Sequence, residues 1–154
     1  MKKWCNIIVP TFICLLIGST AKYFQSDSLR TWYPYLHKSI LSPPNIAFPI
    51  AWGIIYLCMG ISIGLIFNLK GLQKKSAVFY FCIQLFFNFT WSISFFYYQN
   101  PLLGLINIIL LDCAVLIFTF KCYSIQKISA WLFFPYIIWL GLATYLNSYI
   151  VIYN

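Results

Sequence analysis

The chain has 154 residues, of which 62% are hydrophobic, 21% are aromatic and only 8% are charged. Soluble domains carry roughly 25% charged residues, so this composition excludes a water-facing globular domain and indicates an integral membrane protein. The net charge of +8 does not indicate nucleic acid as a partner, because the Lys residues lie in short clusters between apolar blocks. There they act as topology signals and contact lipid headgroups.

Apolar blocks about as long as a bilayer crossing of roughly 20 residues divide the chain. We therefore predict an all-α fold, with residues 1–154 forming a single membrane domain of five transmembrane helices. The spans are expected at 5–24, 47–68, 77–98, 102–120 and 129–149, and the long loop at 25–45. His37 is the only histidine, Glu is absent and the cysteines form no C-x-x-C pair. These absences predict no metal site and no paired-carboxylate catalyst.

The first apolar block follows Lys2 and Lys3 and ends near Ser19-Thr20-Ala21. This pattern also resembles a cleavable secretory signal. We favour a retained first helix, because a chain with several further spans can use its first helix as an anchor.

The loop over residues 25–45 is not a plain polar linker, because it combines aromatic residues with cations. Pro34, Pro43 and Pro44 stiffen it by fixing φ, and Pro44 favours a helix boundary just after it. We expect this loop to pack over the mouth of the helix bundle.

The second block carries Phe48, Trp52 and Tyr56 at four-residue intervals, which places the three rings on one helical face. Gly60 and Gly64 form a G-x-x-x-G pair that permits close helix approach. That approach can be made within the chain or between two copies, and packing within the chain is the favoured interpretation.

Polar and aromatic residues recur every three or four positions on two later helices. The third helix carries Gln84, Asn88, Trp91, Ser92 and Phe95, and the fifth carries Pro135, Trp139, Ala143 and Asn147. Two interpretations remain open at this point. The stripes can line one cavity, or their amides can bond across helix interfaces and hold the bundle together.

Asp112 is the one acidic residue within a predicted span. A charge there costs about 3 kcal/mol on insertion scales, so we expect it to be protonated or hydrogen-bonded. Structural anchoring is favoured over proton-coupled transport, because the spans offer no basic partner.

Positive charge is unequally distributed over the two sides of the membrane. The amino end and the second and fourth connections hold Lys2, Lys3, Lys70, Lys74, Lys75, Lys121 and Lys127, whereas the other side holds Lys22, Arg30 and Lys38. The positive-inside rule therefore predicts a cytoplasmic amino terminus and an outward-facing long loop.

Several stretches, in order, resemble the TspO/MBR family of tryptophan-rich sensory and translocator proteins. They are WYPYLHKSILSPPNIAFPIAWGIIYLCMGIS, QLFFNFTWSISFF, a fourth helix with Asp112, and PYIIWLGLATYLN. The resemblance implies a five-helix membrane bundle, commonly a homodimer, in a bacterial cell membrane. It also implies binding of porphyrins such as protoporphyrin IX and of benzodiazepine-type or isoquinoline ligands, with no required cofactor.

The resemblance also implies which residues form the pocket. The family's ligand-binding positions fall on Trp32, Tyr33, Trp52, Tyr56, Gln84, Asn88, Ser92, Trp139 and Ala143. The sterol pattern of some members is incomplete here, since no Lys or Arg follows Tyr149. A flat macrocycle would stack on the aromatic rings, and its propionates would meet Lys22, Arg30, His37 or Lys38.

Three functional hypotheses follow. The leading one is a membrane receptor for protoporphyrin IX, with light-dependent porphyrin degradation as a secondary activity that would use Trp52 and Trp139. The runner-up is a transporter of tetrapyrroles or other amphiphiles. The third is a sensory or scaffold protein whose ligand changes its contacts with a partner.

Overall fold

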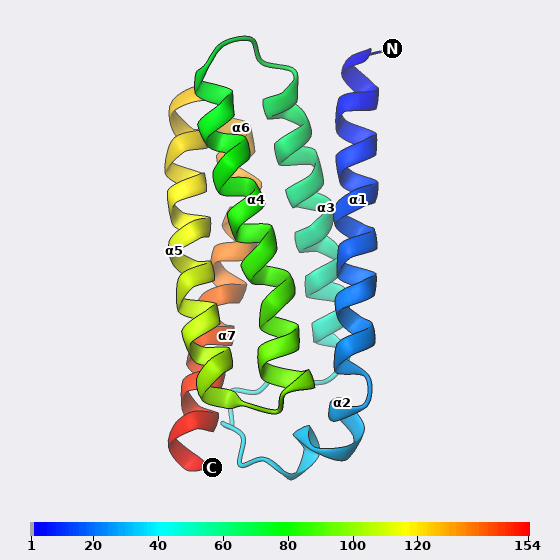
Figure 1. Cartoon of the computed structure of the whole chain (residues 1–154), viewed down its shortest axis with the longest axis vertical. Coiled ribbons are helices and arrows are strands. Elements are labelled where there is room, and N and C mark those ends of the chain that lie inside the picture. Colours follow the sequence, from blue (N-terminus) through cyan, green and yellow to red (C-terminus); the bar gives the residue numbers. More distant parts are fainter. Residues whose placement is uncertain (1) are drawn as a thin grey trace.

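A computed structural model describes residues 2–154 as a bundle of long helices that run side by side (Figure 1). Over these residues the chain forms helices and no strand. The helices are α1 (Lys2–Gln25), α3 (Ala47–Phe67), α4 (Gln73–Ser92), α5 (Pro101–Ile125) and α7 (Phe134–Tyr153), with a short α6 (Lys127–Trp131) before α7. Five segments are long and apolar enough to cross a bilayer. The predicted fold class, an all-α integral membrane bundle, is confirmed.

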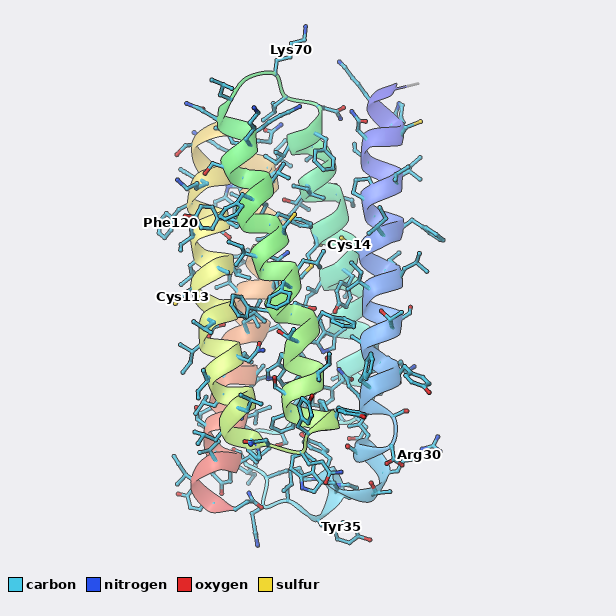
Figure 2. The ribbon with its side chains drawn as sticks, viewed as in Figure 1. Cys14, Arg30, Tyr35, Lys70, Cys113 and Phe120 are labelled. Carbon is cyan, nitrogen blue, oxygen red and sulfur yellow. The ribbon has the colours of Figure 1, made fainter. Side chains whose placement is uncertain are left out.

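The amino end of α1 and the carboxyl end of α7 lie at opposite ends of the bundle (Figure 1). The long connection after α1 lies across the end where the chain finishes. It is not wholly irregular, because it contains α2 (Ser28–Thr31) and a 3-10 turn at Tyr33–Tyr35. Lys70 stands at one end of the molecule, and Arg30 and Tyr35 stand at the other (Figure 2).

The helices extend beyond the apolar blocks from which spans were predicted. The third crossing begins at Gln73 rather than at residue 77, and α5 continues to Ile125 rather than to residue 120. The additional turns contain Lys74, Lys75 and Lys121. Long Lys side chains can keep the ammonium group in water while their stems lie along apolar surface, so helical turns at the membrane boundary accept them.

Glycines allow α1 and α3 to pack closely. A Cβ built on Gly60 would overlap the backbone of Thr11, and one built on Gly64 would lie 2.6 Å from the Cα of Ile7. On α1, Gly18 leaves room for the ring of Tyr56. The G-x-x-x-G pair therefore serves packing within the chain, which is the interpretation that we favour from the sequence.

The last crossing is interrupted between α6 and α7 at Leu132 and Phe133. Pro135 stands in the first turn of α7, where it cannot donate a hydrogen bond to the carbonyl four residues earlier. The interruption buries Phe133 completely against Phe118, with ring centroids 4.4 Å apart. Near the α6 end of the bundle, the core thus combines packed aromatic rings with the buried Ser62 and Ser129, whose hydroxyls donate to each other's carbonyls.

Candidate ligand-binding site

A cavity lies between the helices near the other end of the bundle, next to the long connection. Its volume is about 40 Å³, whereas sites for drug-sized ligands are roughly 300–1,000 Å³. A large ligand therefore requires the surrounding rings to move. The lining residues are Tyr33, Phe48, Trp91, Phe95, Phe96, Trp139, Leu142, Ala143, Leu146, Asn147 and Ile150.

Aromatic rings form most of the cavity wall. Trp91 stacks on Phe95 with centroids 5.5 Å apart and an interplanar angle of 17°. Phe48 meets Trp139 edge to face at 5.6 Å. The cavity thus offers flat apolar faces from α3, α4 and α7, which suits a planar aromatic guest.

The end of α4 departs from α-helical geometry beside the cavity. Residues Ile93–Tyr97 form a π-helical turn, in which the amide of Tyr98 donates to the carbonyl of Ile93 at 2.9 Å. Phe95 and Phe96 are neighbours in sequence, yet both are buried and both line the cavity. Such turns are frequent at functional sites.

Side-chain hydrogen bonds hold the end of α1 and the long connection against α4, the π-helical turn and α7. The Ser28 hydroxyl donates to the carbonyl of Phe96, and the Gln25 amide donates to the Ser92 hydroxyl at 2.8 Å. Further along, the hydroxyls of Ser39 and Tyr145 lie 3.0 Å apart. The connection is therefore held over the cavity at several points.

Asn88 lies at the centre of a buried polar network. Its Oδ1 accepts from the Tyr56 hydroxyl at 2.6 Å, and its Nδ2 donates to the Tyr136 hydroxyl at 2.6 Å. Trp52 stacks on Tyr56, with centroids 5.6 Å apart. These residues join α3, α4 and α7.

Asn147 lines the cavity, but its side chain is hydrogen-bonded to other parts of the bundle. Its Oδ1 accepts from the Trp91 indole at 3.3 Å, and its Nδ2 donates to the carbonyl of Pro101 at 2.8 Å. Both interpretations of the stripes thus describe part of the molecule. The aromatic members surround a cavity, and Asn88 and Asn147 bond across helix interfaces.

The nine sequence-predicted ligand positions fall into distinct places. Tyr33, Trp139 and Ala143 line the cavity. Trp32 borders a separate surface hollow and meets the cavity residue Phe95 edge to face. Trp52, Tyr56 and Asn88 belong to the polar network, and Ser92 accepts from Gln25. The structure gives Gln84 no such partner.

Gln84 is buried on α4 with 0% of its surface exposed. Among residues 2–154, neither its Oε1 nor its Nε2 has a hydrogen-bond partner. A buried polar group without a partner costs about 1–3 kcal/mol. Gln84 is therefore a predicted ligand position whose amide lacks a hydrogen-bond partner in the described chain, although it is not among the residues that line the cavity.

Of the four candidate propionate contacts, Lys38 is the one that touches a cavity residue among those the structure describes. Its Nζ lies 4.8 Å from the centre of the Tyr33 ring, and burial raises the pKa of the Tyr33 phenol above its ordinary value. Lys22 and Arg30 are exposed. His37 makes backbone hydrogen bonds with the side chain of Asn154.

Asp112 is hydrogen-bonded, as expected. The Thr144 hydroxyl donates to its Oδ2 at 2.8 Å and so joins α5 to α7. The carboxyl is half-buried. Within the described part of the chain, the lining of the cavity does not include Asp112. This geometry agrees with structural anchoring.

Sequence reasoning missed several members of the site. Phe96, Leu142, Leu146 and Ile150 line the cavity, and Tyr136 completes the polar network. Spacing could have identified part of this set, because residues 139, 142, 146 and 150 recur every three or four positions on α7. No spacing rule reveals Phe96, which reaches the cavity through the π-helical turn.

Comparisons with known proteins agree with this architecture. A family model of the TspO/MBR family matches residues 10–153. The tryptophan-rich protein TspO of Archaeoglobus fulgidus is 37% identical over 150 residues, covering 97% of each chain. That of Chlorobaculum tepidum is 32% identical over 92% of this chain and 91% of its own. The human translocator protein is 29% identical over 91% of this chain and 82% of its own. The chain belongs to the TspO/MBR family.

Proposed function

We propose that this chain is a membrane receptor that binds protoporphyrin IX, and related flat apolar ligands, in the aromatic cavity next to the long connection. The observation that carries the proposal is the set of planar faces contributed by Phe48, Trp91 and Trp139 from three helices. Offset and edge-to-face aromatic contacts favour a planar macrocycle by about 0.5–1.5 kcal/mol per pair. The small cavity volume implies that ligand binding displaces these rings.

The polar edges of a porphyrin need partners near the cavity. Lys38 is the favoured propionate contact, because its ammonium already lies over Tyr33 in the cavity wall. A charge-assisted hydrogen bond to a carboxylate is stronger than a neutral one. The unpartnered amide of Gln84 does not line the cavity in the described chain. It is the candidate partner for a polar group of a ligand that displaces the surrounding rings.

Binding is tested by titrating the protein with protoporphyrin IX in darkness and following tryptophan fluorescence. Trp139→Phe should weaken the Kd by about tenfold, equivalent to about 1.4 kcal/mol. Trp131→Phe is the matched control, because Trp131 is 63% exposed and does not line the cavity in the described chain. Equal affinity in both variants would contradict the proposed site.

Light-dependent degradation of the bound porphyrin is a second candidate. Trp139 lines the cavity, and Trp52 stacks on Tyr56 in the adjoining network. An electron-rich indole can donate an electron to the excited macrocycle, and dissolved oxygen is the oxidant that then attacks the porphyrin, so no acid or base is required. Porphyrin loss under light at equal rates in the parent and in a Trp52→Phe, Trp139→Phe double variant would remove any specific role for these indoles.

The orientation follows from charge. Lys70 stands at the end opposite Arg30 and Tyr35 (Figure 2), and the basic connections share its end of the bundle with the start of α1 (Figure 1). The positive-inside rule favours a cytoplasmic amino terminus, and the relatives include bacterial and archaeal proteins. We therefore infer that the long connection and the cavity face outward from the cytoplasm.

A further inference from the structure

A turn in the long connection carries two large apolar side chains at its tip. The amide of Ser42 donates to the carbonyl of Ser39 at 3.0 Å, which leaves Ile40 and Leu41 as the central residues. Ile40 is 99% exposed and Leu41 is 60% exposed. Turn centres in water favour Gly, Pro, Asn, Asp and Ser. The composition of this turn suits an apolar environment.

On its way to α3 the connection runs inward beside α7, past the level of the end of that helix (Figure 1). Three contacts with α7 and its carboxyl end follow this course. From the carboxyl end inward, His37 hydrogen-bonds to Asn154 at 2.8 Å and the Ser39 hydroxyl hydrogen-bonds to that of Tyr145 at 3.0 Å. Further inward, the rings of Phe48 and Trp139 meet with centroids 5.6 Å apart.

The spacing of these contacts sets the depth of the turn. At 1.5 Å per residue, positions 139 and 154 are about 22 Å apart along the helix, and the turn lies between them. The crossing over Lys127–Tyr153 has 27 residues, or about 40 Å against a hydrocarbon thickness of about 30 Å. With the crossing centred in the bilayer, the helix end extends about 5 Å beyond the hydrocarbon on each side. Tyr145, which contacts Ser39, lies eight residues inward of Tyr153, or about 12 Å, so the turn lies about 7 Å inside the edge of the hydrocarbon.

Further exposed apolar residues follow the tip in sequence, at the start of a transmembrane helix. Ile46, at the start of α3, and Ile50, one turn later, are both exposed. Since α3 is a membrane-spanning helix, its exposed apolar residues face acyl chains. Ile40, Leu41, Ile46 and Ile50 together are called the turn patch below.

We propose that the turn patch is embedded in the bilayer just inside the boundary between headgroups and acyl chains, so that the long connection is itself a membrane-inserted element. Its partner is the lipid surface. Two observations favour lipid over a second copy of the chain. The connection leads from this turn directly into the membrane-spanning α3, whose first turns expose Ile46 and Ile50, and the exposed Lys38 lies two residues before the tip, where a cation can meet anionic headgroups.

The test places the fluorescent amino acid Anap at position 40 or position 35 of the full-length protein, which is then reconstituted into phosphatidylcholine and phosphatidylglycerol vesicles. Nitroxide lipids labelled on the acyl chain or on the headgroup report depth, and aqueous iodide reports exposure to water. Tyr35 is the matched control, since it is 83% exposed in the same connection and stands at the extreme end of the molecule (Figure 2). Both sites are exposed, so neither change disturbs packing.

The proposal expects acyl-chain nitroxide to quench the probe at position 40 at least about twofold more than the probe at position 35, as for a group buried 5–10 Å into the interface. Iodide should quench position 35 more strongly. Equal iodide quenching at both positions would overturn the proposal. So would protection of position 40 from iodide and from both nitroxides, because a second protein copy would then cover the tip.

Discussion

Tyr56 on α3 and Asn88 on α4 are joined by a 2.6 Å hydrogen bond from the phenol to Oδ1 of the amide. The same amide donates through Nδ2 to Tyr136 on α7. A single side chain thus links three helices. All three residues are buried, so water is not available to replace these hydrogen bonds.

The first prediction concerns this network. Asn88→Leu keeps a similar volume but leaves two buried phenols without partners, at about 1–3 kcal/mol each. We expect a loss of about 3 kcal/mol in the free energy of unfolding, measured by thermal or denaturant unfolding in detergent micelles. Tyr35→Phe removes an exposed phenol and should leave the stability unchanged. A variant of Asn88 as stable as the parent would show that the network does not hold the helices.

The second prediction concerns the packing of α1 on α3. Gly60→Ala should destabilise the fold by about 1–3 kcal/mol, because the added methyl group overlaps the backbone of Thr11. Gly53→Ala on the same helix is the control, since a Cβ there meets nothing within 4 Å. Helix propensity should make it neutral or more stable by up to about 1 kcal/mol. Equal melting temperatures for the two variants would contradict this packing.

Much of this fold follows from the sequence, because hydrophobic blocks of bilayer length determine the number of crossings. The glycine pair at residues 60 and 64 also has a local cause, since small residues permit close helix approach. Helix ends are harder to predict, because hydropathy ends at Lys74 or Lys121 whereas the helix does not.

The division of the stripes into cavity and network could not be predicted from spacing. Asn88 and Asn147 belong to the same three- and four-residue stripes as Ser92 and Ala143. Which of their polar atoms find a hydrogen-bond partner depends on contacts with other helices. The partner of Asn88 on α7, Tyr136, is 48 residues away in sequence. Equally, the π-helical turn that brings Phe96 to the cavity has no local sequence signature among the rules of periodicity.

The third prediction concerns the unpartnered amide of Gln84. Gln84→Leu should raise the free energy of unfolding of the ligand-free protein by about 1–2 kcal/mol, because it removes a buried polar group that lacks a hydrogen bond. The same change should weaken protoporphyrin IX binding if the amide serves the ligand. Calorimetric unfolding and a binding titration on one preparation measure both effects. A destabilised variant would mean that the amide already has a partner in the folded protein.

The fourth prediction separates anchoring from transport at Asp112. Asp112→Asn retains an oxygen that can accept from Thr144, so its unfolding and porphyrin binding should match the parent. Asp112→Ala should lose about 1 kcal/mol. Porphyrin flux into sealed proteoliposomes is the decisive readout. Flux above that of empty vesicles that disappears in the Asn variant would support the transporter hypothesis over the receptor.

The central claim is that a porphyrin occupies the cavity beside α7, and equilibrium binding of protoporphyrin IX in darkness to two variants of this helix tests it most directly. Ala143 lines the cavity, whereas Gly141 is exposed and has open space around it. Ala143→Leu should weaken the Kd by at least about tenfold by filling the site, and Gly141→Leu should bind as the parent does. Parent-like affinity in the Ala143→Leu protein would contradict the claim.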